Sequence, residues 1–367
     1  MKILYAGNIA NIGYLVAKQL RANSVDIDLL LENRPIVEQD PAKQDPELQN
    51  VYPQWVRFYE KNSSGWKRNI MKTMRKYDLI ESQYEHNIFA YFSRRPIVSR
   101  IVGDDLRDLA FSSSLRGFLM RRALRRARAV LFSTPAELAL LARLKIKNMI
   151  FLPLFADVEF FKPVDTARGD FTDKFVVFHP ANLWSLKGNS ILVKGFAEFI
   201  KDDSDAILIM IDRGPDSKVI HDLVDKLDIS RNVHFLKGPL NSVELRHYYN
   251  ISDVIADQFV VPEIGGIGRE ALCCQKPLLT LFDEAGYEKL FGEKPPVINA
   301  SNHMEILDRL NYLKDAKVRM EIGKKGRDWA CKHHSLVTYS KKLLAIYEGI
   351  LDRERIDRVR DRLSEIS

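Results

Sequence analysis

Short apolar runs alternate with longer amphipathic stretches along this chain, and the alternation occurs twice. The first set of predicted strands comprises residues 2–7, 26–32, 77–82, 96–102, 128–133 and 148–152. The second set comprises residues 175–179, 206–211, 233–236, 254–256, 277–280 and 297–298. Strands that alternate with helices in this way are typical of an open parallel sheet covered by helices. The sequence therefore predicts an α/β fold with two Rossmann-like domains in tandem.

A change in composition near the middle of the chain marks the expected domain boundary. Residues 153–173 are rich in Pro, Asp and Phe and have no clean period. We predict an N-terminal domain over residues 1–155, a linker over residues 156–173 and a second domain over residues 174–340. Residues 341–367 belong to a charged amphipathic helical region, which either returns to the first domain or forms a detached solvated tail.

The chain carries 56 Lys and Arg residues against 49 Asp and Glu residues, a net charge of +7. Small phosphate-bearing ligands, an anionic membrane or nucleic acid would each account for a basic protein. No nucleic-acid partner is expected, because the basic residues lack interleaved aromatic residues and no nucleic-acid-binding module is recognisable. The chain has no run of about 18 uncharged apolar residues and no signal-peptide layout, and its three cysteines form neither a disulfide framework nor a zinc site. We therefore expect a cytoplasmic protein.

Residues 253–280 combine a strand, a glycine-rich loop, a helix predicted from about Arg269, and a second strand. The loop glycines are Gly265, Gly266 and Gly268. A glycine-rich turn that opens a helix offers unpaired N–H groups and the positive end of the helix dipole to an anion. Glu270, one residue into this helix, reaches a polar ligand group that the loop positions. The alternative is an ordinary strand–loop–helix crossover whose glycines permit close packing.

This segment resembles the donor-binding segment of GT-B glycosyltransferases, in particular family 4. Those enzymes carry two glutamates seven residues apart around a glycine-rich loop, and the second holds the nucleotide ribose. Glu270 stands at the second position, whereas Pro262 occupies the first, with Glu263 beside it. Some family members have Asp-Gln upstream in place of the first glutamate, and Asp257 and Gln258 stand there. The segment is either this variant form or one shifted by a residue so that Glu263 serves.

Lys187 and Gly188 lie in the turn after the first strand of the second domain. A lysine ammonium at such a turn suits a diphosphate, and the pair resembles the Lys-Gly element whose lysine binds the donor phosphates in family 4. The arginine that relatives carry several residues earlier is missing, and His179 or Asn182 is a weak substitute. A surface lysine in a turn is the alternative. The remaining donor-binding candidates, also carried over from the resemblance, are Arg213, Phe235, Lys237 and Gly238.

Two segments of the first domain supply acceptor-side candidates through the same resemblance. The loop after the first strand has Gly-x5-Gly spacing, so it is not a dinucleotide-binding turn, but the corresponding loop of GT-B enzymes faces the interdomain cleft. The segment after the strand at residues 96–102 matches a family segment in which many relatives place a histidine where this chain has Val102. No histidine role is therefore assigned. The candidates are Gly7, Asn8, Gly13, Gly103, Asp105 and Arg107.

The resemblance implies two domains that face a cleft, with the last helix crossing back to the first domain. It further implies transfer of a sugar, with retention and without a metal or cofactor, from a nucleotide-diphosphate sugar to a lipid-linked, polysaccharide or other glycan acceptor. Preorganised positive charge from Lys187 and the N–H groups of residues 265–268 would stabilise the leaving diphosphate. The catalytic candidates are Lys187, Glu263 and Glu270. The alternative is a non-catalytic GT-B-like binding or scaffold subunit of a glycan-assembly system.

A predicted helix within residues 115–130 places most of its arginines on one side and its apolar residues on the other. Basic residues near an anionic bilayer contribute about 1 kcal/mol each. An anionic membrane surface is therefore a second predicted partner, which would place the protein at the inner face of the membrane. The alternative is a helix docked on the core with a solvated outer face. The predicted contacts are Arg121, Arg122, Arg125 and Arg126, supported by Lys67, Arg68, Lys72, Arg75 and Lys76.

Overall fold

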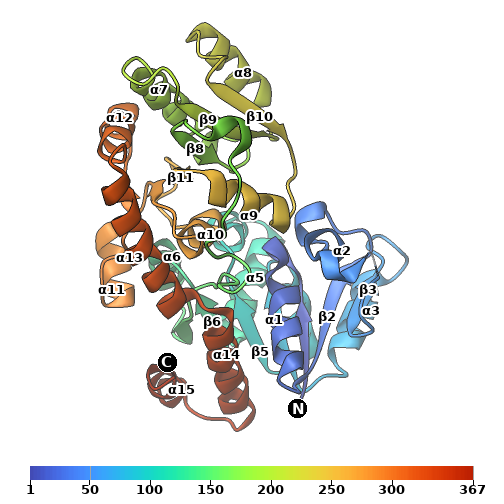
Figure 1. Ribbon diagram of the computed structural model, residues 1–367. Helices are drawn as coiled ribbons and strands as arrows, with labels where there is room; N and C mark the ends of the chain where they lie inside the picture. The colour runs from blue at the N-terminus through green and yellow to red at the C-terminus, as the bar shows by residue number, and fades with distance from the viewer. Residues whose placement is uncertain (50, 367) are drawn as a thin grey trace. The chain divides into compact units, whose positions relative to one another are not determined.

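The computed structural model describes residues 1–49 and 51–366, and the chain divides into two compact units. The first unit comprises Met1–Leu154 and Leu336–Ser367, and the second comprises Phe155–Ser335. Each unit is built on one parallel β-sheet covered by helices (Figure 1). The predicted α/β fold with two Rossmann-like domains is therefore confirmed.

The sheet of the first unit has seven strands in the order β3-β2-β1-β4-β5-β6-β7. The order reverses direction at β1, which pairs in parallel with both β2 and β4. The strands are β1 (Lys2–Ala6), β2 (Asp26–Glu32), β3 (Val56–Tyr59), β4 (Leu79–Gln83), β5 (Ile97–Arg100), β6 (Ala129–Phe132) and β7 (Met149–Phe151). The sequence predicted all of these except β3. This short edge strand buries only its two end residues, so it has neither an apolar run nor an alternating pattern.

The helices of the first unit follow the strands and carry local start signals. For example, the Thr134 side chain accepts from the backbone of Glu137, whose own side chain caps the helix in return. The first helix begins two residues earlier than the predicted residue 14. The α-helices are α1 (Ile12–Ala22), α2 (Pro41–Gln44), α3 (Trp66–Met74), α4 (His86–Ser93), α5 (Leu115–Arg126), α6 (Pro135–Arg143), α14 (Leu336–Leu351) and α15 (Ile356–Ser364).

Helix α14 packs in the first unit through buried polar contacts. The hydroxyl of Tyr347 donates to Oε2 of Glu81 at 2.5 Å, and Nη2 of Arg100 donates to the hydroxyl of Tyr339 at 2.7 Å. Glu81 and Arg100 are fully buried on β4 and β5. Buried charges are tolerated only when they are paired and hydrogen-bonded, so these contacts hold α14 in one register. The alternative of a detached solvated tail is wrong.

The sheet of the second unit has six strands in the order β10-β9-β8-β11-β12-β13. The order reverses at β8, which pairs in parallel with both β9 and β11. The strands are β8 (Val176–His179), β9 (Ile207–Asp212), β10 (Val233–Lys237), β11 (Val254–Ala256), β12 (Leu278–Thr280) and β13 (Ile298–Asn299). Each corresponds to a predicted strand.

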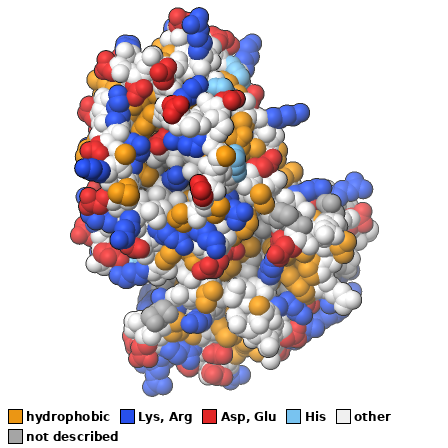
Figure 2. Space-filling model, in the orientation of Figure 1, with side chains coloured by type: hydrophobic (Ala, Val, Ile, Leu, Met, Phe, Trp, Pro, Cys, Tyr) orange, Lys and Arg blue, Asp and Glu red, His pale blue; other side chains and the backbone are white. Residues whose placement is uncertain are grey.

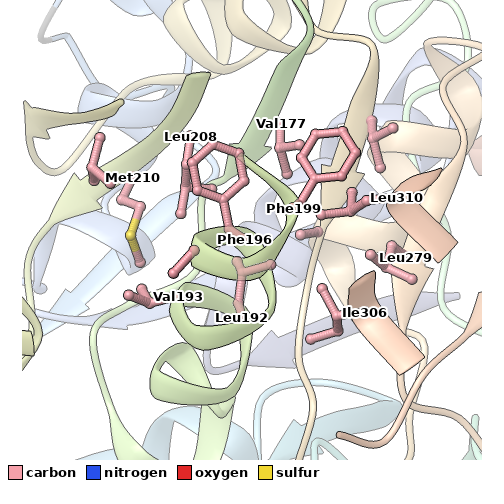
Figure 3. Close-up of a cluster of buried hydrophobic side chains, with 14 of the residues drawn as sticks. Val177, Leu192, Val193, Phe196, Phe199, Leu208, Met210, Leu279, Ile306 and Leu310 are labelled. Carbon is pink, nitrogen blue, oxygen red and sulfur yellow. The ribbon is translucent and has the colours of Figure 1, made fainter. Parts of the chain in front are cut away.

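Helix α7 supplies the centre of one hydrophobic core of this unit. Figure 3 shows Phe196 and Phe199 of this helix pointing toward strand residues such as Val177 and Leu208. Burying each such side chain contributes roughly 1.5–3 kcal/mol. The helices of the unit are α7 (Asn189–Phe199), α8 (Ser217–Lys226), α9 (Ser242–Ile251), α10 (Gly266–Cys273), α11 (Glu284–Phe291), α12 (His303–Tyr312) and α13 (Ala316–His334).

Residues 156–173, which the sequence analysis treated as a linker, belong to the second unit. Phe161 is buried against the ring of Tyr249, with the ring centroids 5.9 Å apart. Arg168 donates to Oδ2 of Asp253 at 2.7 Å. The division between the units falls after Leu154, and the second unit ends at Ser335 instead of residue 340. No helix in the described part of the chain is long and apolar enough to cross a bilayer.

Candidate functional sites

The strand-order reversal of the second unit brings together two loops that are distant in sequence. The loop after β8 carries Lys187, and the loop after β11 carries Gln258. The Lys187 ammonium donates to Oε1 of Gln258 at 2.6 Å, and Nε2 of Gln258 donates to the carbonyl of Glu263 at 2.8 Å. In open α/β sheets, ligands bind outside the carboxyl ends of strands at such a reversal. The structure therefore assembles three predicted site residues, Lys187, Gln258 and the catalytic candidate Glu263, at a place suited to a ligand.

The backbone around Lys187 is rigidly held. Its N–H donates to the carbonyl of Trp184 at 2.7 Å, and its carbonyl accepts from the N–H of Phe259 at 2.9 Å. Gly188 has a φ of +70°, and a Cβ there would lie 2.9 Å from Cβ of Phe259. Glycine is required at this position because only it combines a left-handed backbone with so close an approach. The turn therefore fixes the direction in which the lysine leaves the backbone.

His179 does not replace the missing arginine. It is fully buried at the end of β8, where Nδ1 lies 2.9 Å from the carbonyl of Ala256 and Nε2 lies 2.8 Å from the amide nitrogen of Asn189. The amide of Asn189 is a donor, so Nε2 is the acceptor and the Nδ1–H group donates. Burial lowers the pKa of His179 to about 4. The neutral ring joins β8 to β11 and carries no charge for a phosphate. Asn182 is exposed.

Helix α10 begins at Gly266, not at the predicted Arg269. The three glycines predicted a longer loop, but the helix includes both Gly266 and Gly268. A Cβ on Gly268 would lie 2.8 Å from Cδ2 of Leu278, so this glycine fits the close-packing alternative. Gly266 is exposed, and a Cβ there would meet nothing nearer than 3.7 Å. Close packing does not account for Gly266.

Asp257 lies buried beside the start of α10. A Cβ on Gly265 would stand 3.0 Å from its Oδ2. Among the described residues, neither carboxylate oxygen has a partner that meets the distance and angle limits of a hydrogen bond. Burial raises the pKa of Asp257, while the charge of Lys187 and the nearby amides of Gly265 and Gly268 oppose that rise. The Asp257 carboxylate therefore lies next to the N-terminal amides of α10, the same amides that an anion bound there would contact.

Glu270 is fixed by a residue to which the sequence analysis gave no role. The hydroxyl of Tyr249 donates to Oε2 of Glu270 at 2.8 Å, and the Tyr249 ring is fully buried against Phe178. Burial raises the pKa of Glu270 to about 7, although the Tyr249 hydrogen bond and the charge of Arg269 lower it. This carboxyl group therefore changes its ionisation near neutral pH in a fixed orientation.

The other donor-side candidates lie in or just after β9 and β10, and three of them make structural contacts. The Phe235 ring stacks on His221 with centroids 3.8 Å apart. A Cβ on Gly238 would lie 2.5 Å from Cγ2 of Ile211, so that glycine is needed for close approach. The Arg213 carbonyl accepts from the N–H of Leu183 at 2.7 Å, which joins this loop to the one after β8. The remaining candidate, Lys237, is exposed.

The strand-order reversal of the first unit carries a pocket of 380 Å³. Gly7 and Asn8 line it, but Asn8 is buried and its side chain is committed to the loop. Its Oδ1 accepts from the N–H of Tyr14 at 2.7 Å, and its Nδ2 donates to the carbonyl of Gln39 at 2.8 Å. The pocket lining is Gly7, Asn8, Ile9, Leu31, Glu32, Arg34, Pro35, Ile36, Gln39, Tyr59, Lys61, Gln83, Tyr84, Glu85 and His86.

Gly13 is not a pocket residue. It lies inside α1, where a Cβ would stand 2.4 Å from the carbonyl oxygen of Gly7 and 2.9 Å from the ring of Tyr5. The second glycine of the predicted loop therefore permits the helix to pack on the strand end, and the alternative of a plain strand-to-helix turn holds for this residue.

His86 lies in the pocket and was missed by the sequence analysis. Its Nε2 stands 3.2 Å from the hydroxyl of Tyr59, and burial lowers its pKa to about 4. The family resemblance places an acceptor-site histidine just before Gly103, where this chain has Val102. His86 instead follows the neighbouring strand β4, whose carboxyl end is the other side of the reversal. Its position just after the strand predicted at residues 77–82 was the available signal.

The segment with Gly103, Asp105 and Arg107 does not line this pocket. Asp105 is fully buried, and its Oδ1 accepts from the N–H groups of Val102 and Leu106, both at 3.1 Å. Burial raises its pKa to about 7, although these backbone hydrogen bonds oppose the rise. Arg107 pairs at the surface with Asp104 at 3.1 Å. Asp105 is therefore a loop-holding residue, which corrects the expectation that it meets an acceptor.

An apolar groove of 440 Å³ adjoins the pocket, and Lys61 and Glu85 line both. Leu115, at the start of α5, is 72% exposed, and Phe92, at the end of α4, is 42% exposed. Exposed apolar surface of this kind marks an interaction site when it is gathered in one place. The groove lining is Lys61, Trp66, Lys67, Met71, Glu85, Ile88, Phe89, Phe92, Leu115, Arg116 and Leu119.

The arginines of α5 are not equivalent. Arg121 donates to the carbonyls of Ala110 and Ser112 at 2.6 and 2.9 Å, so it stabilises the preceding turn and is a poor membrane contact. The other three arginines predicted to contact a membrane, Arg122, Arg125 and Arg126, are exposed. On the face that Figure 2 displays, Lys and Arg side chains are interspersed with Asp and Glu.

No group of three or more His, Cys, Asp or Glu side chains within residues 1–49 and 51–366 is arranged to hold a metal ion. Asp203, in the predicted surface turn, pairs with Lys314 at 3.1 Å.

Residues 164–329 match the family described as glycosyl transferases group 1. This match indicates a transferase enzyme, and the matched residues include every donor-side residue described above. No curated protein matches the chain.

Solved structures resemble nearly the whole chain. The Anabaena protein HepE, solved in complex with UDP and glucose, is 17% identical, has a TM-score of 0.76, and is matched over 95% of this chain and 100% of its own. Sucrose-phosphate synthase from Thermosynechococcus elongatus is 16% identical with a TM-score of 0.73, over 96% of this chain and 100% of its own. A glycosyltransferase from Rickettsia africae is 15% identical with a TM-score of 0.69, over 95% and 98%. At these identities the likeness establishes the GT-B fold.

Proposed function

We propose that this protein transfers a sugar from a nucleoside-diphosphate sugar to a lipid-linked acceptor, with retention at the anomeric carbon and without a metal or cofactor. The observation that carries the proposal is the Lys187–Gln258 contact at the strand-order reversal, with Glu270 held by Tyr249 in the same unit. A cation, helix-end amides and an oriented carboxylate are the groups needed to hold a diphosphate and a ribose.

The donor diphosphate would take the place of the Gln258 oxygen on the Lys187 ammonium. In the reaction, the bond between the anomeric carbon and the diphosphate oxygen breaks, and a bond to an acceptor hydroxyl oxygen forms on the same face. The hydroxyl proton passes to the departing diphosphate. Lys187 and the exposed start of α10 at Gly266 stabilise the charge that develops on the leaving group, as preorganised donors do.

Glu270 would accept hydrogen bonds from the ribose hydroxyls. The base would be held beside the loops after β9 and β10, near Arg213, Lys237 and Gly238. Uridine is the base to test first, because HepE was solved with UDP and with UDP-glucose. Glu263 remains a candidate catalytic residue, because the Gln258 side chain holds its backbone carbonyl near Lys187.

The acceptor would bind in the first unit. Its reacting hydroxyl would enter the pocket that Gly7, Asn8 and His86 line, and its lipid chain would lie in the adjoining apolar groove. The pocket and the groove are adjacent, because Lys61 and Glu85 line both. A polar pocket beside an apolar groove matches an amphiphile, which favours a lipid-linked acceptor over a soluble polysaccharide. On this proposal the enzyme is cytoplasmic and works at the inner face of the membrane, near the exposed arginines of α5.

Calorimetric titration with UDP, CDP, GDP and ADP tests the donor half of this proposal. One nucleotide should bind, and Lys187→Ala should weaken it strongly while Lys226→Ala, an exposed lysine on α8, leaves it unchanged. The matching nucleotide sugar should then be consumed in the presence of lipid extract. Binding without transfer or donor hydrolysis would favour the non-catalytic scaffold alternative, and no binding at all would overturn the donor site.

A further inference from the structure

A depression of 1050 Å³ lies at the amino ends of strands in the first unit's sheet, whereas the 380 Å³ pocket lies at the carboxyl ends. It is formed where β4, β5 and β6 begin and where α4, α5 and α14 end. The residues immediately before these three strands are Asp78, Pro96 and Arg128. The lining is Asp78, Arg94, Arg95, Pro96, Ile97, Arg125, Arg126, Ala127, Arg128, Ile350, Leu351 and Arg353.

The charge of this depression is strongly unbalanced. Six of its lining residues are arginines and one, Asp78, is an acid. Oδ2 of Asp78 already accepts from the backbone N–H of Lys2 at 2.7 Å. Arginine does not lose its proton in proteins, so a net charge of five persists at every physiological pH. Like charges gathered in this way repel one another and destabilise the fold unless an anion joins them.

Two of the arginines have structural duties. Nε of Arg95 donates to the carbonyl of Arg75 at 3.0 Å, and Nη2 of Arg125 donates to the carbonyl of Leu144 at 3.4 Å. The side chains of the other four make no ion pair and no hydrogen bond within residues 1–49 and 51–366. These four are Arg94, Arg126, Arg128 and Arg353, and all are exposed.

Helix dipoles account for only part of the cluster. Arginine is favoured at helix C-termini, and α4, α5 and α14 all end at this depression. Each helix end is equivalent to roughly half a negative charge. Three ends supply about one and a half negative charges against a net five positive charges, so most of the positive charge is left uncompensated.

We propose that this depression binds a ligand with several phosphate groups. The guanidinium fork matches phosphate oxygens bidentately, and four uncommitted arginines around one hollow suit a ligand with more than one phosphate. The lining contains no aromatic side chain, so a stacked nucleic-acid base has no platform there. The phosphates belong either to a soluble compound or to lipid head groups. This site is separate from the donor site of the second unit and does not depend on the proposed transferase activity.

The test compares two triple variants in a Lys187→Ala background, which removes phosphate binding at the donor site. The site variant is Arg126→Ala/Arg128→Ala/Arg353→Ala. The control, Lys218→Ala/Lys226→Ala/Lys324→Ala, removes the same charge from exposed positions on α8 and α13 of the second unit. The probes are inorganic tripolyphosphate, vesicles of phosphatidylglycerol with phosphatidylcholine, and vesicles of phosphatidylcholine alone. Binding is measured by calorimetry and by vesicle sedimentation, and circular dichroism verifies the fold of each variant.

We expect the site variant to weaken binding of tripolyphosphate or of anionic vesicles at least about tenfold, because it removes several charge-assisted hydrogen bonds. The control should change binding much less. Loss confined to tripolyphosphate identifies a soluble ligand, and loss confined to anionic vesicles identifies lipid head groups. Equal binding by the two triple variants, or no binding of any probe by the parent protein, overturns the proposal.

Discussion

The Lys187 ammonium lies 2.6 Å from Oε1 of Gln258, although the two residues are 71 positions apart in the chain. They meet because β8 and β11 are parallel neighbours in the sheet, so the loops that follow the two strands lie side by side at the carboxyl ends. No local sequence pattern predicts that these two residues meet. The contact fixes the position of the Lys187 ammonium at the strand-order reversal.

Lys187→Ala is expected to lower the transfer rate about 10²- to 10³-fold, the usual cost of removing one preorganised donor to a developing charge. The measurement is kcat with saturating nucleotide sugar. The Lys226→Ala protein serves as the control, since that lysine is exposed on α8. Full transfer activity in Lys187→Ala would mean that the diphosphate is held elsewhere.

Donor affinity is expected to rise with pH through about 7, because burial raises the pKa of Glu270 to that value. Below this pH the carboxyl is protonated and accepts ribose hydrogen bonds poorly, and above it the carboxylate accepts them well. The dissociation constant of the bound nucleotide should therefore be measured from about pH 6 to about pH 8. Glu270→Gln should bind more weakly and lose this dependence. An unchanged pH profile in Glu270→Gln would refute the assignment.

Tyr249→Phe tests whether the tyrosine hydroxyl positions Glu270. The hydroxyl donates to the carboxylate and lowers its pKa, so its removal should move the pH midpoint of donor binding upward. The lost hydrogen bond is worth about 1 kcal/mol, so affinity at neutral pH should fall roughly fivefold. Tyr248→Phe is the matched control, because the Tyr248 ring packs on Phe178. A weaker affinity with an unmoved midpoint would indicate a packing effect alone.

Leu115→Asp tests the proposed lipid groove. Leu115 is 72% exposed and opens α5, where an acid is favoured by the helix dipole, so the fold should be kept. A charge in the apolar groove should raise KM for a lipid-linked acceptor about tenfold, as expected when one large apolar contact is lost. The dissociation constant of the donor should not change. Met320→Asp, at an equally exposed position on α13 (65%), is the control. An unaltered acceptor KM would argue against a lipid chain in the groove.

Asp105→Asn is expected to stabilise the protein at alkaline pH. Burial raises the folded-state pKa of Asp105 to about 7, so the native state binds a proton that the unfolded chain releases near pH 4. The stability due to this group is present at low pH and is lost as pH rises from about 4 through 7, by a few kcal/mol at most. The variant should therefore melt above the parent protein at about pH 8 and close to it at about pH 5. Exposed Asp108→Asn should show no such difference.

Local patterns were enough to predict most of the fold. Apolar runs and turn residues located every strand except β3, whose edge position leaves Arg57 and Phe58 exposed. The same patterns located Lys187 in its turn and Glu270 in its helix. These features depend on residues close in sequence, because side-chain periodicity and turn chemistry are local properties.

The tertiary structure decided what those residues contact. It places Gln258 on Lys187, brings Tyr249 to Glu270, buries Asp105 in its own loop, and puts His86 in the first unit's pocket. It also gathers arginines from three helix ends into one depression. None of this is visible in a local pattern, because strand order and helix packing bring together segments that are distant in sequence, and burial then sets the charge and the available partners of each side chain.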